Sequence, residues 1–238
     1  MNPVLNKKTF ENVVYENYET MSISGVVNKS FILWLILAAG AYFGWQNPLL
    51  ILQQSLFWLI FAITVTLCLL ITFNPKMSAY FSPLYAFGEG LFLGAITLFF
   101  EKDYPGIAIN AVFLTIAVLF LMLTAFKSGK IRATKKFRLV VITSTLAICG
   151  VYLVDILLYA FNVPGITFIH SSGFIGILFS VFVVIIASLN LILDFDLIQK
   201  GVALGAPKYM EWYCSFALMV TIVWLYLEIL RLLAKTRR

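Results

Sequence analysis

The chain of 238 residues is 62% hydrophobic and only 12% charged, and its formal net charge at pH 7 is +6. Soluble domains average roughly 45–50% apolar and about 25% charged residues, so this composition excludes an ordinary soluble domain. It predicts an integral membrane protein whose surroundings are a lipid bilayer. No nucleotide-binding loop is present, and the lysines and arginines lie in connecting segments, so no nucleic-acid partner is expected.

Seven apolar runs predict an all-α fold of seven transmembrane helices. A crossing helix needs about 20 mostly apolar residues to span a hydrocarbon core of about 30 Å. The first run is short and needs flanking residues to complete its crossing. The expected spans, in chain order, are Phe31–Trp45, Leu56–Phe73, Pro83–Phe100, Ile107–Phe126, Leu139–Phe161, Gly173–Leu193 and Trp212–Ala234.

The chain is expected to consist of a polar N-terminal segment, residues 1–29, and one transmembrane domain, residues 30–238. No cleavable signal peptide is expected, because the N-terminal segment is mixed in charge and lacks an apolar core. Prolines are expected at or between span ends, where a residue without an amide hydrogen is least costly. They are Pro48, Pro75, Pro83, Pro105, Pro164 and Pro207.

The basic residues indicate an orientation, because lysine and arginine are retained on the cytoplasmic side in short loops. The loop at residues 127–138 holds six of the 17 basic residues. This pattern places the N-terminus in the cytoplasm and the protein in the cell membrane. Arg231 and the basic tail after it then lie outside, so a last segment that re-enters instead of crossing is an alternative.

Two aspartates follow Ile156–Leu193, a stretch without any charged residue. Asp194 and Asp196 are about 200° apart around a helix, so they cannot face the same partner. Asp196 has Lys200 four residues further on, which is the spacing of a surface ion pair. Asp194, expected near the cytoplasmic end of span six, has no such local partner. An ionisable group at membrane depth is a functional candidate.

Three further acids are candidates for the same pathway: Glu89 in span three, Asp155 in the outer half of span five, and Glu211 at the start of span seven. Glu89 and Glu211 lie on the same side of the membrane as Asp194 in this topology. For Glu89, a role in helix packing through its two flanking glycines is an alternative. For Asp155, the alternative is a hydrogen bond to a tyrosine or threonine across helices.

Two other polar residues have simpler interpretations. Glu228 is expected to pair with Arg231, three residues further on along a helix. His170 is expected in a loop, and no GxSxG nucleophile motif accompanies it, so an enzyme is not expected.

The segment "LILDFDLIQKG", followed by a short loop and "GAPKYMEWYCSFALMVTIVWLYLEILRLL", carries a resemblance to a known family. With "NPVLN" at the start and "SPLYAFGEGLFLGAIT" at span three, the chain resembles the bacterial branch of the transmembrane Bax inhibitor motif family over nearly its whole length. The resemblance implies one seven-helix bundle with the last helix central, which leaks calcium in a pH-dependent way.

In that family, a closed pore is attributed to one aspartate at the end of span six and another in span seven, which share a proton near an arginine. The resemblance places the first on Asp194, with Asp196 as second choice. The position of the second holds Val220 or Thr221, and span two contains no basic residue.

The leading hypothesis is therefore a pH-sensitive leak for calcium or other cations, with Asp194 as the gate and Glu89, Asp196 or Glu211 as its partner. The alternative is a regulatory membrane protein that binds a membrane protease or another membrane partner. No cofactor is expected, since calcium is the transported ion.

Overall fold

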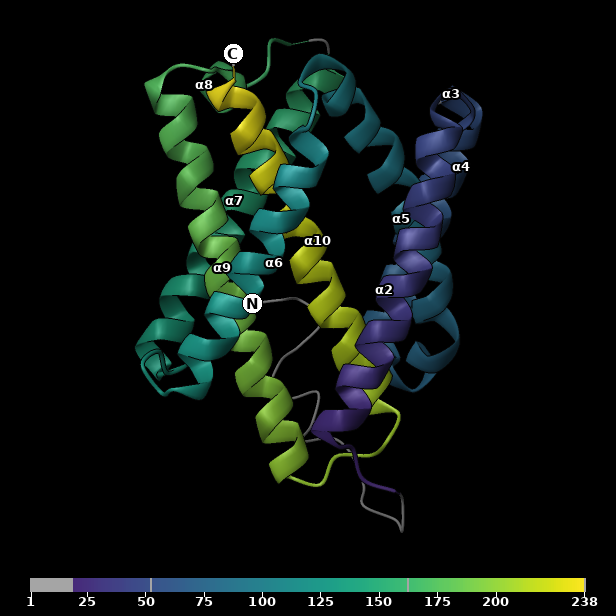
Figure 1. Cartoon of the computed structure of the whole chain (residues 1–238), viewed down its shortest axis with the longest axis vertical. Coiled ribbons are helices and arrows are strands. Elements are labelled where there is room, and N and C mark those ends of the chain that lie inside the picture. The colour runs from purple at the N-terminus through teal and green to yellow at the C-terminus, as the bar shows by residue number, and fades with distance from the viewer. Residues whose placement is uncertain (1–18, 52, 162, 238) are drawn as a thin grey trace. The chain divides into compact units, whose positions relative to one another are not determined.

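The computed structural model describes residues 19–51, 53–161 and 163–237. The first 18 residues of the expected N-terminal segment lie outside the described residues. Within the described chain the elements are helical: α2 (Ile23–Gln46), α3 (Pro48–Ile51), α4 (Gln54–Phe73), the 3₁₀ turn η1 (Pro75–Met77), α5 (Ser78–Asp103), α6 (Ile107–Lys127), α7 (Lys135–Ala160), α8 (Thr167–His170), α9 (Phe174–Ala203) and α10 (Met210–Thr236) (Figure 1).

Seven of the described helices are long and apolar enough to cross a membrane, which confirms the predicted number and type of spans. The short first run is completed from upstream, because α2 begins at Ile23. Its N-cap is Ser22, whose hydroxyl accepts a hydrogen bond from the backbone amide of Gly25. Of the seven, α10 has the largest share of its apolar stretch buried, 61% against 11–50% for the others.

Two expectations about helix ends are wrong. Pro83 lies inside α5, which begins at Ser78. A proline in the second turn of a helix removes only one hydrogen bond, so the helix continues through it. The helix of span six does not end at Leu193, because α9 runs on to Ala203. Gly205, two residues further on, has a left-handed φ of 67°, which terminates many helices.

The described chain forms two compact units. Of the described residues, unit 1 contains 106–161, 163–195 and 221–237, and unit 2 contains 19–51, 53–105 and 196–220. Both α9 and α10 therefore contribute one part to each unit.

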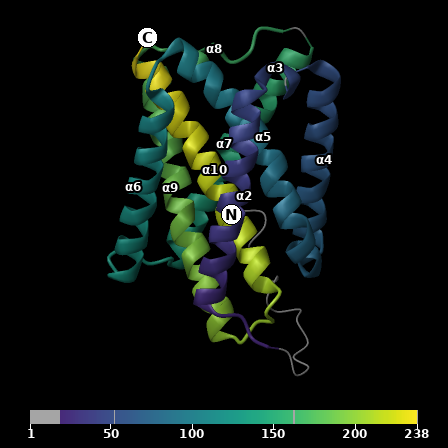
Figure 2. The ribbon, with the colours of Figure 1, turned by 45° about the vertical axis from the view of Figure 1, so that its right-hand side comes forward.

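Unit 2 is built on a close contact between α2 and α5, which lie side by side in Figures 1 and 2. Glycines make the approach possible. A Cβ atom at Gly90 would lie 2.3 Å from the carbonyl oxygen of Leu37, and one at Gly94 would lie 1.9 Å from that of Ala41. Small residues at helix contacts are the usual way in which membrane helices pack, because lipid supplies no hydrophobic force to press helices together.

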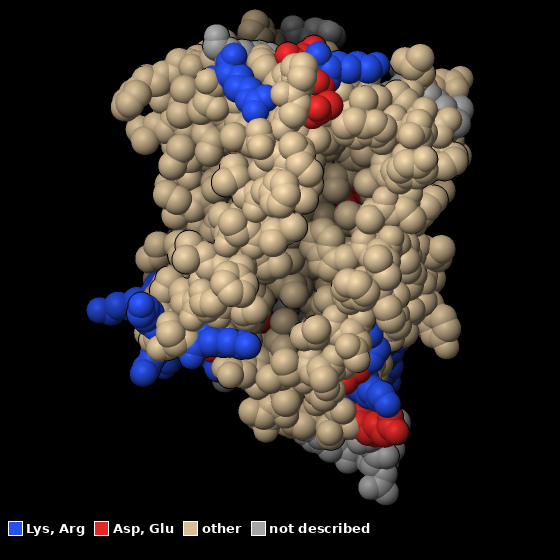
Figure 3. Space-filling view, viewed as in Figure 1, with Lys and Arg blue, Asp and Glu red and all other residues tan. Residues whose placement is uncertain are grey.

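Unit 1 has an apolar core between α7 and α9. Ile148 from α7 packs there with Val183 and Ile186 from α9, and partly buried Tyr152, Phe179 and Trp224 cover this cluster. Many large apolar side chains on the outside of the helices are exposed, as expected for surfaces that face lipid. On the face shown in Figure 3, charged side chains gather near helix ends, and the surface between them is almost entirely uncharged.

Candidate functional site

Asp194 is a fully buried carboxylate inside α9, with 0% of its surface exposed. It lies within the helix and not at its end, because α9 continues for nine residues to Ala203. The hydroxyl Oγ1 of Thr221, on α10, donates a hydrogen bond of 2.6 Å to Asp194 Oδ2. A buried carboxyl group is costly unless hydrogen bonds compensate it, and this short contact provides such compensation at one oxygen of Asp194.

Thr221, the hydrogen-bond partner of Asp194, was indicated only weakly by the sequence. It stands in the region where the family resemblance places a second aspartate, and it is 4% exposed. A threonine in an apolar helix ordinarily bonds a carbonyl of its own helix, so its type alone gives no signal. Its position was the indication: Thr221 is one of the two residues, with Val220, at the place where the family resemblance expects the second aspartate.

A second polar contact lies one helical turn from Asp194. Asn190, also on α9 and 2% exposed, donates from Nδ2 to Thr145 Oγ1 on α7 at 2.8 Å and to the carbonyl oxygen of Ile186 at 2.9 Å. Three helices of unit 1 thus contribute buried polar side chains here: Thr145 from α7, Asn190 and Asp194 from α9, and Thr221 from α10. Sequence reasoning did not single out Asn190 or Thr145.

Glu228 is the centre of another buried cluster in unit 1. It is 1% exposed, and it pairs with Arg231 at 3.0 Å, which confirms the predicted ion pair. Tyr152 donates to both carboxylate oxygens, at 3.1 and 3.0 Å, and Trp224 Nε1 donates at 3.2 Å. The Arg231 guanidinium also lies over the Tyr152 ring, 5.1 Å from its centre. This carboxylate is therefore held by donors from two helices.

Asp155 belongs to the end of α7 and binds the segment that follows it. Its Oδ1 accepts a 2.8 Å hydrogen bond from the backbone amide of Ile166, and its Oδ2 lies 2.8 Å from His170 Nε2. His170 lies in the short helix α8 and not in a loop. The partners of Asp155 are thus a backbone amide and a histidine, and not the tyrosine or threonine of the alternative. Asp155 holds a connection between helices.

Asp196 and Glu89 both belong to unit 2. Asp196 makes the predicted ion pair with Lys200, at 2.8 Å. Glu89 is hydrogen-bonded by Tyr85, one turn earlier on α5. Its two flanking glycines do serve helix packing, since Gly90 meets α2 and a Cβ atom at Gly88 would lie 2.8 Å from Thr64 Oγ1 on α4.

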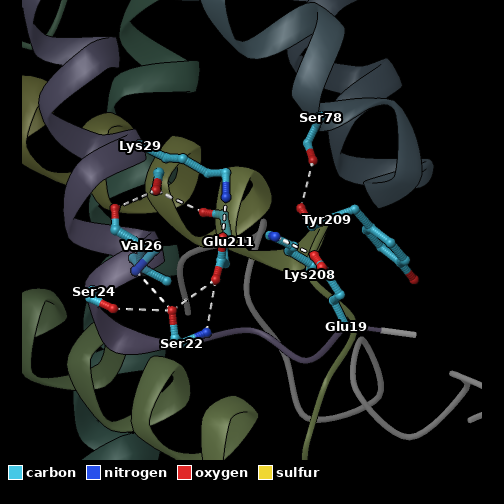
Figure 4. Close-up of polar contacts among 11 residues, drawn as sticks. Glu19, Ser22, Ser24, Val26, Lys29, Ser78, Lys208, Tyr209 and Glu211 are labelled. Carbon is cyan, nitrogen blue, oxygen red and sulfur yellow. Dashed lines mark hydrogen bonds and ion pairs between the residues drawn. The ribbon is translucent and has the colours of Figure 1, made fainter. Parts of the chain in front are cut away.

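Glu211, at the start of α10, is engaged with α2 (Figure 4). Lys29 forms an ion pair with its Oε2. The backbone amide and the hydroxyl of Ser22 donate to Oε1, at 2.9 and 3.1 Å. Gly25 leaves room for this carboxylate, because a Cβ atom there would lie 2.0 Å from Oε1. Glu211 therefore ties the beginnings of two membrane helices together.

The residues just before α2 continue this connection along the loop between α9 and α10. The backbone amide of Met21 donates to the carbonyl oxygen of Ala206 at 2.7 Å. The backbone amide of Lys208 donates to the carbonyl oxygen of Glu19 at 2.8 Å. The side chains of Lys208 and Glu19 also pair (Figure 4). The Glu19 carboxylate raises the pKa of Lys208 above that of an ordinary lysine. A raised lysine pKa means that Lys208 keeps its charge at neutral pH and loses the contact on the alkaline side as pH rises through its pKa.

Among the described residues, no group of three or more histidine, cysteine, aspartate or glutamate side chains could hold a metal ion. The candidate acids are instead distributed. Asp194, Asp155 and Glu228 lie in unit 1, and Asp196, Glu89 and Glu211 lie in unit 2.

These features define a polytopic membrane protein with seven apolar helices and carboxylates buried inside its spans. The family model described as Bax inhibitor 1 like matches residues 2–238, so the chain belongs to that family. The resemblance seen in the sequence is thereby confirmed. No curated protein and no solved structure matches the chain.

Proposed function

We propose that this protein is a proton-sensitive leak for calcium or other cations, with Asp194 as its gate. The observation that carries the proposal is the full burial of the Asp194 carboxylate in a membrane helix, where Thr221 is its hydrogen-bond donor. Intramembrane acids are rare because they are costly, and those that occur commonly mark ion pathways or proton relays.

The charge of Asp194 couples pH to conformation. With a proton bound, Asp194 is neutral, and the tightly packed arrangement around it is stable. Without the proton, a negative charge in a medium of low dielectric favours any arrangement that brings water or a cation to it. Deprotonation therefore shifts the population toward the open state, and the leak increases as pH rises.

Membership of the family supports this proposal, and the chain departs from the family's pattern in one respect. The place of the second aspartate is taken by Thr221, whose hydroxyl cannot share the titrating proton as a carboxylate does. Because Asp196 is paired with Lys200, the proton-sharing acid would be Glu89 or Glu211. Substituting each with its amide identifies it, because only that substitution changes the pH response of the leak.

The test is calcium flux into proteoliposomes of the purified protein, measured as a function of pH. Asp194→Asn removes the titrating charge and keeps nearly the same shape, so we expect a flux that no longer follows pH. Asp196→Asn is the matched control, since its partner is Lys200, and it should leave the pH response in place. An unchanged profile in Asp194→Asn would overturn the assignment of the gate.

In this proposal the protein lies in the cell membrane with its N-terminus in the cytoplasm. It carries out no catalytic step and needs no resident cofactor.

If wild-type liposomes show no flux at any pH, the regulatory alternative takes precedence. In that case the chain would act by binding a membrane protease or another membrane protein. The contacts that hold residues 19–22 to the start of α10 favour this alternative, because they would transmit binding at the N-terminal segment to a membrane helix.

A further inference from the structure

The amide of Asn190 has a buried oxygen without a hydrogen-bond donor. Both hydrogens of Nδ2 are used, one by Thr145 Oγ1 and one by the Ile186 carbonyl. The Thr145 hydroxyl in turn donates to the carbonyl of Val141 at 2.8 Å. Asn190 Oδ1 accepts no hydrogen bond within the described part of the chain.

The orientation of this amide is fixed by its surroundings. The Ile186 carbonyl can only accept, so the amide nitrogen must face it. Exchanging Nδ2 and Oδ1 would place two oxygen atoms against each other. The unpaired atom is therefore an acceptor, and it requires a donor or a cation.

Such an oxygen is unusual inside a membrane protein. Nearly all buried side-chain oxygens have a partner, and the hydrocarbon core supplies no water to replace one. Apolar residues flank Asn190 on both sides, Leu189 and Leu191, so the buried amide is not part of a polar stretch of the helix.

The position of Asn190 connects it to the gate. It precedes Asp194 by four residues, so the two side chains lie on the same face of α9, about 6 Å apart along the axis. Going the other way along this face, Ile186 and Val183 belong to the apolar cluster of unit 1. Along this face of α9, Asn190 therefore lies between the Asp194 carboxylate and the apolar cluster.

We propose that Asn190 Oδ1 and the Asp194 carboxylate form a coordination site for a hard cation, with the Thr221 hydroxyl beside it. Carboxylate, amide carbonyl and hydroxyl oxygens are the ligands that calcium takes from proteins. This inference rests on the proposed cation leak and adds a residue that determines which ion is taken. An ionised Asp194 supplies the charge, and Asn190 replaces part of the hydration shell before the ion meets the apolar cluster.

Two variants of Asn190 separate the roles of its oxygen and its shape. Asn190→Leu keeps a similar branched shape and removes the oxygen, and Asn190→Asp keeps an oxygen and adds charge. Both variants lose the two Nδ2 hydrogen bonds, so they differ from each other in the oxygen and the charge. The control is Ser188→Ala, because Ser188 is also buried in α9 and its hydroxyl is already bonded to the Val184 carbonyl. Ser188 lies about 200° around the helix from Asn190.

The first measurement is calcium flux in proteoliposomes at a pH where the wild-type leak is open. We expect Asn190→Leu to reduce it at least about tenfold, which corresponds to about 1.4 kcal/mol. Asn190→Asp should keep the leak and increase its preference for calcium over potassium, and Ser188→Ala should match the wild type.

The second measurement is the melting temperature in detergent with and without calcium, since an ion that binds the folded state raises it. Calcium should stabilise the wild type and Asn190→Asp but not Asn190→Leu. This measurement is independent of flux, so it also reports when a variant folds but does not conduct.

The outcomes distinguish the two proposals. A wild type that neither leaks nor responds to calcium overturns both of them. A wild type that leaks, together with an Asn190→Leu variant of equal flux and equal stabilisation by calcium, overturns the coordination site and leaves the leak intact. Stabilisation by calcium that depends on Asn190 without any leak supports the site and overturns the leak.

Discussion

At the scale of single residues, Thr221 is the test of the proposed gate, because its hydroxyl donates to Asp194 at 2.6 Å in the packed arrangement. Thr221→Val keeps the shape and removes the donor, so an ionised Asp194 is less well compensated in this arrangement and opening is favoured more strongly. We expect the onset of calcium flux to move to lower pH by about one unit, which corresponds to about 1.4 kcal/mol for a hydrogen bond to a charged group.

Thr221→Ser is the matched control, because it retains the hydroxyl. Flux in this variant should begin at the wild-type pH. If Thr221→Val and Thr221→Ser show the same onset, the hydrogen bond has no part in gating.

A second prediction at this scale concerns Glu228 and Arg231. Replacing Arg231 with leucine leaves a buried carboxylate without its cation, which Tyr152 and Trp224 compensate only in part. Since Arg231 is half exposed, solvent screens the pair, and we expect a loss of about 1–2 kcal/mol, below the value for a fully buried pair. Thermal unfolding in detergent measures it.

The double variant Glu228→Gln with Arg231→Leu should be more stable than Arg231→Leu alone, because it contains no uncompensated charge. Together with the wild type and the single variant Glu228→Gln, these proteins form a double-mutant cycle that isolates the pair. Equal stability of the single and double variants would show that Glu228 is not charged in the folded protein.

At the scale of elements, the contact between α2 and α5 depends on glycines that have no substitute. A methyl group at Gly94 would collide with the Ala41 carbonyl, a backbone atom that cannot rotate away. We expect Gly94→Ala to destabilise the protein by about 1–3 kcal/mol, the range for overpacking. The measurement is the shift in unfolding temperature in detergent.

Gly150 provides the control for this prediction. It lies in α7 and is exposed, and a Cβ atom at this position would have no neighbour within 4 Å. Gly150→Ala should be neutral or should stabilise the helix by about 0.5–1 kcal/mol, because alanine loses less backbone entropy than glycine. If the two substitutions have the same effect, close packing of α2 on α5 is not the reason for Gly94.

At the scale of the whole molecule, the topology is set by whether the last helix crosses. The helix α10 is continuous over 27 residues, or about 40 Å, which exceeds the hydrocarbon thickness of about 30 Å. A re-entrant last segment would require a break that this helix does not have. We therefore favour the seven-span topology with the C-terminus outside.

Cysteine labelling tests this topology in a background in which Cys68, Cys149 and Cys214 are replaced. A reagent that does not cross the membrane should miss a cysteine in the loop at residues 127–138 and reach one placed after Ala234 when it is added from outside. A tail that is labelled only from inside would contradict a crossing α10.

The sequence by itself determined the number of spans and the local ion pairs. Hydropathy is a property of each segment, and the pairs Asp196–Lys200 and Glu228–Arg231 follow from helical spacing alone. The end of span six was misplaced because a charged residue ends an apolar run without ending a helix.

Only the tertiary structure decided which buried groups meet. Thr221 donates to an aspartate 27 residues away, and Ser22 binds Glu211 across 189 residues. Neither spacing leaves a periodic trace in the sequence, because such contacts depend on how helices pack and not on where residues fall along one helix. The same holds for Asn190, whose unpaired oxygen becomes evident only when the partners of its nitrogen are known.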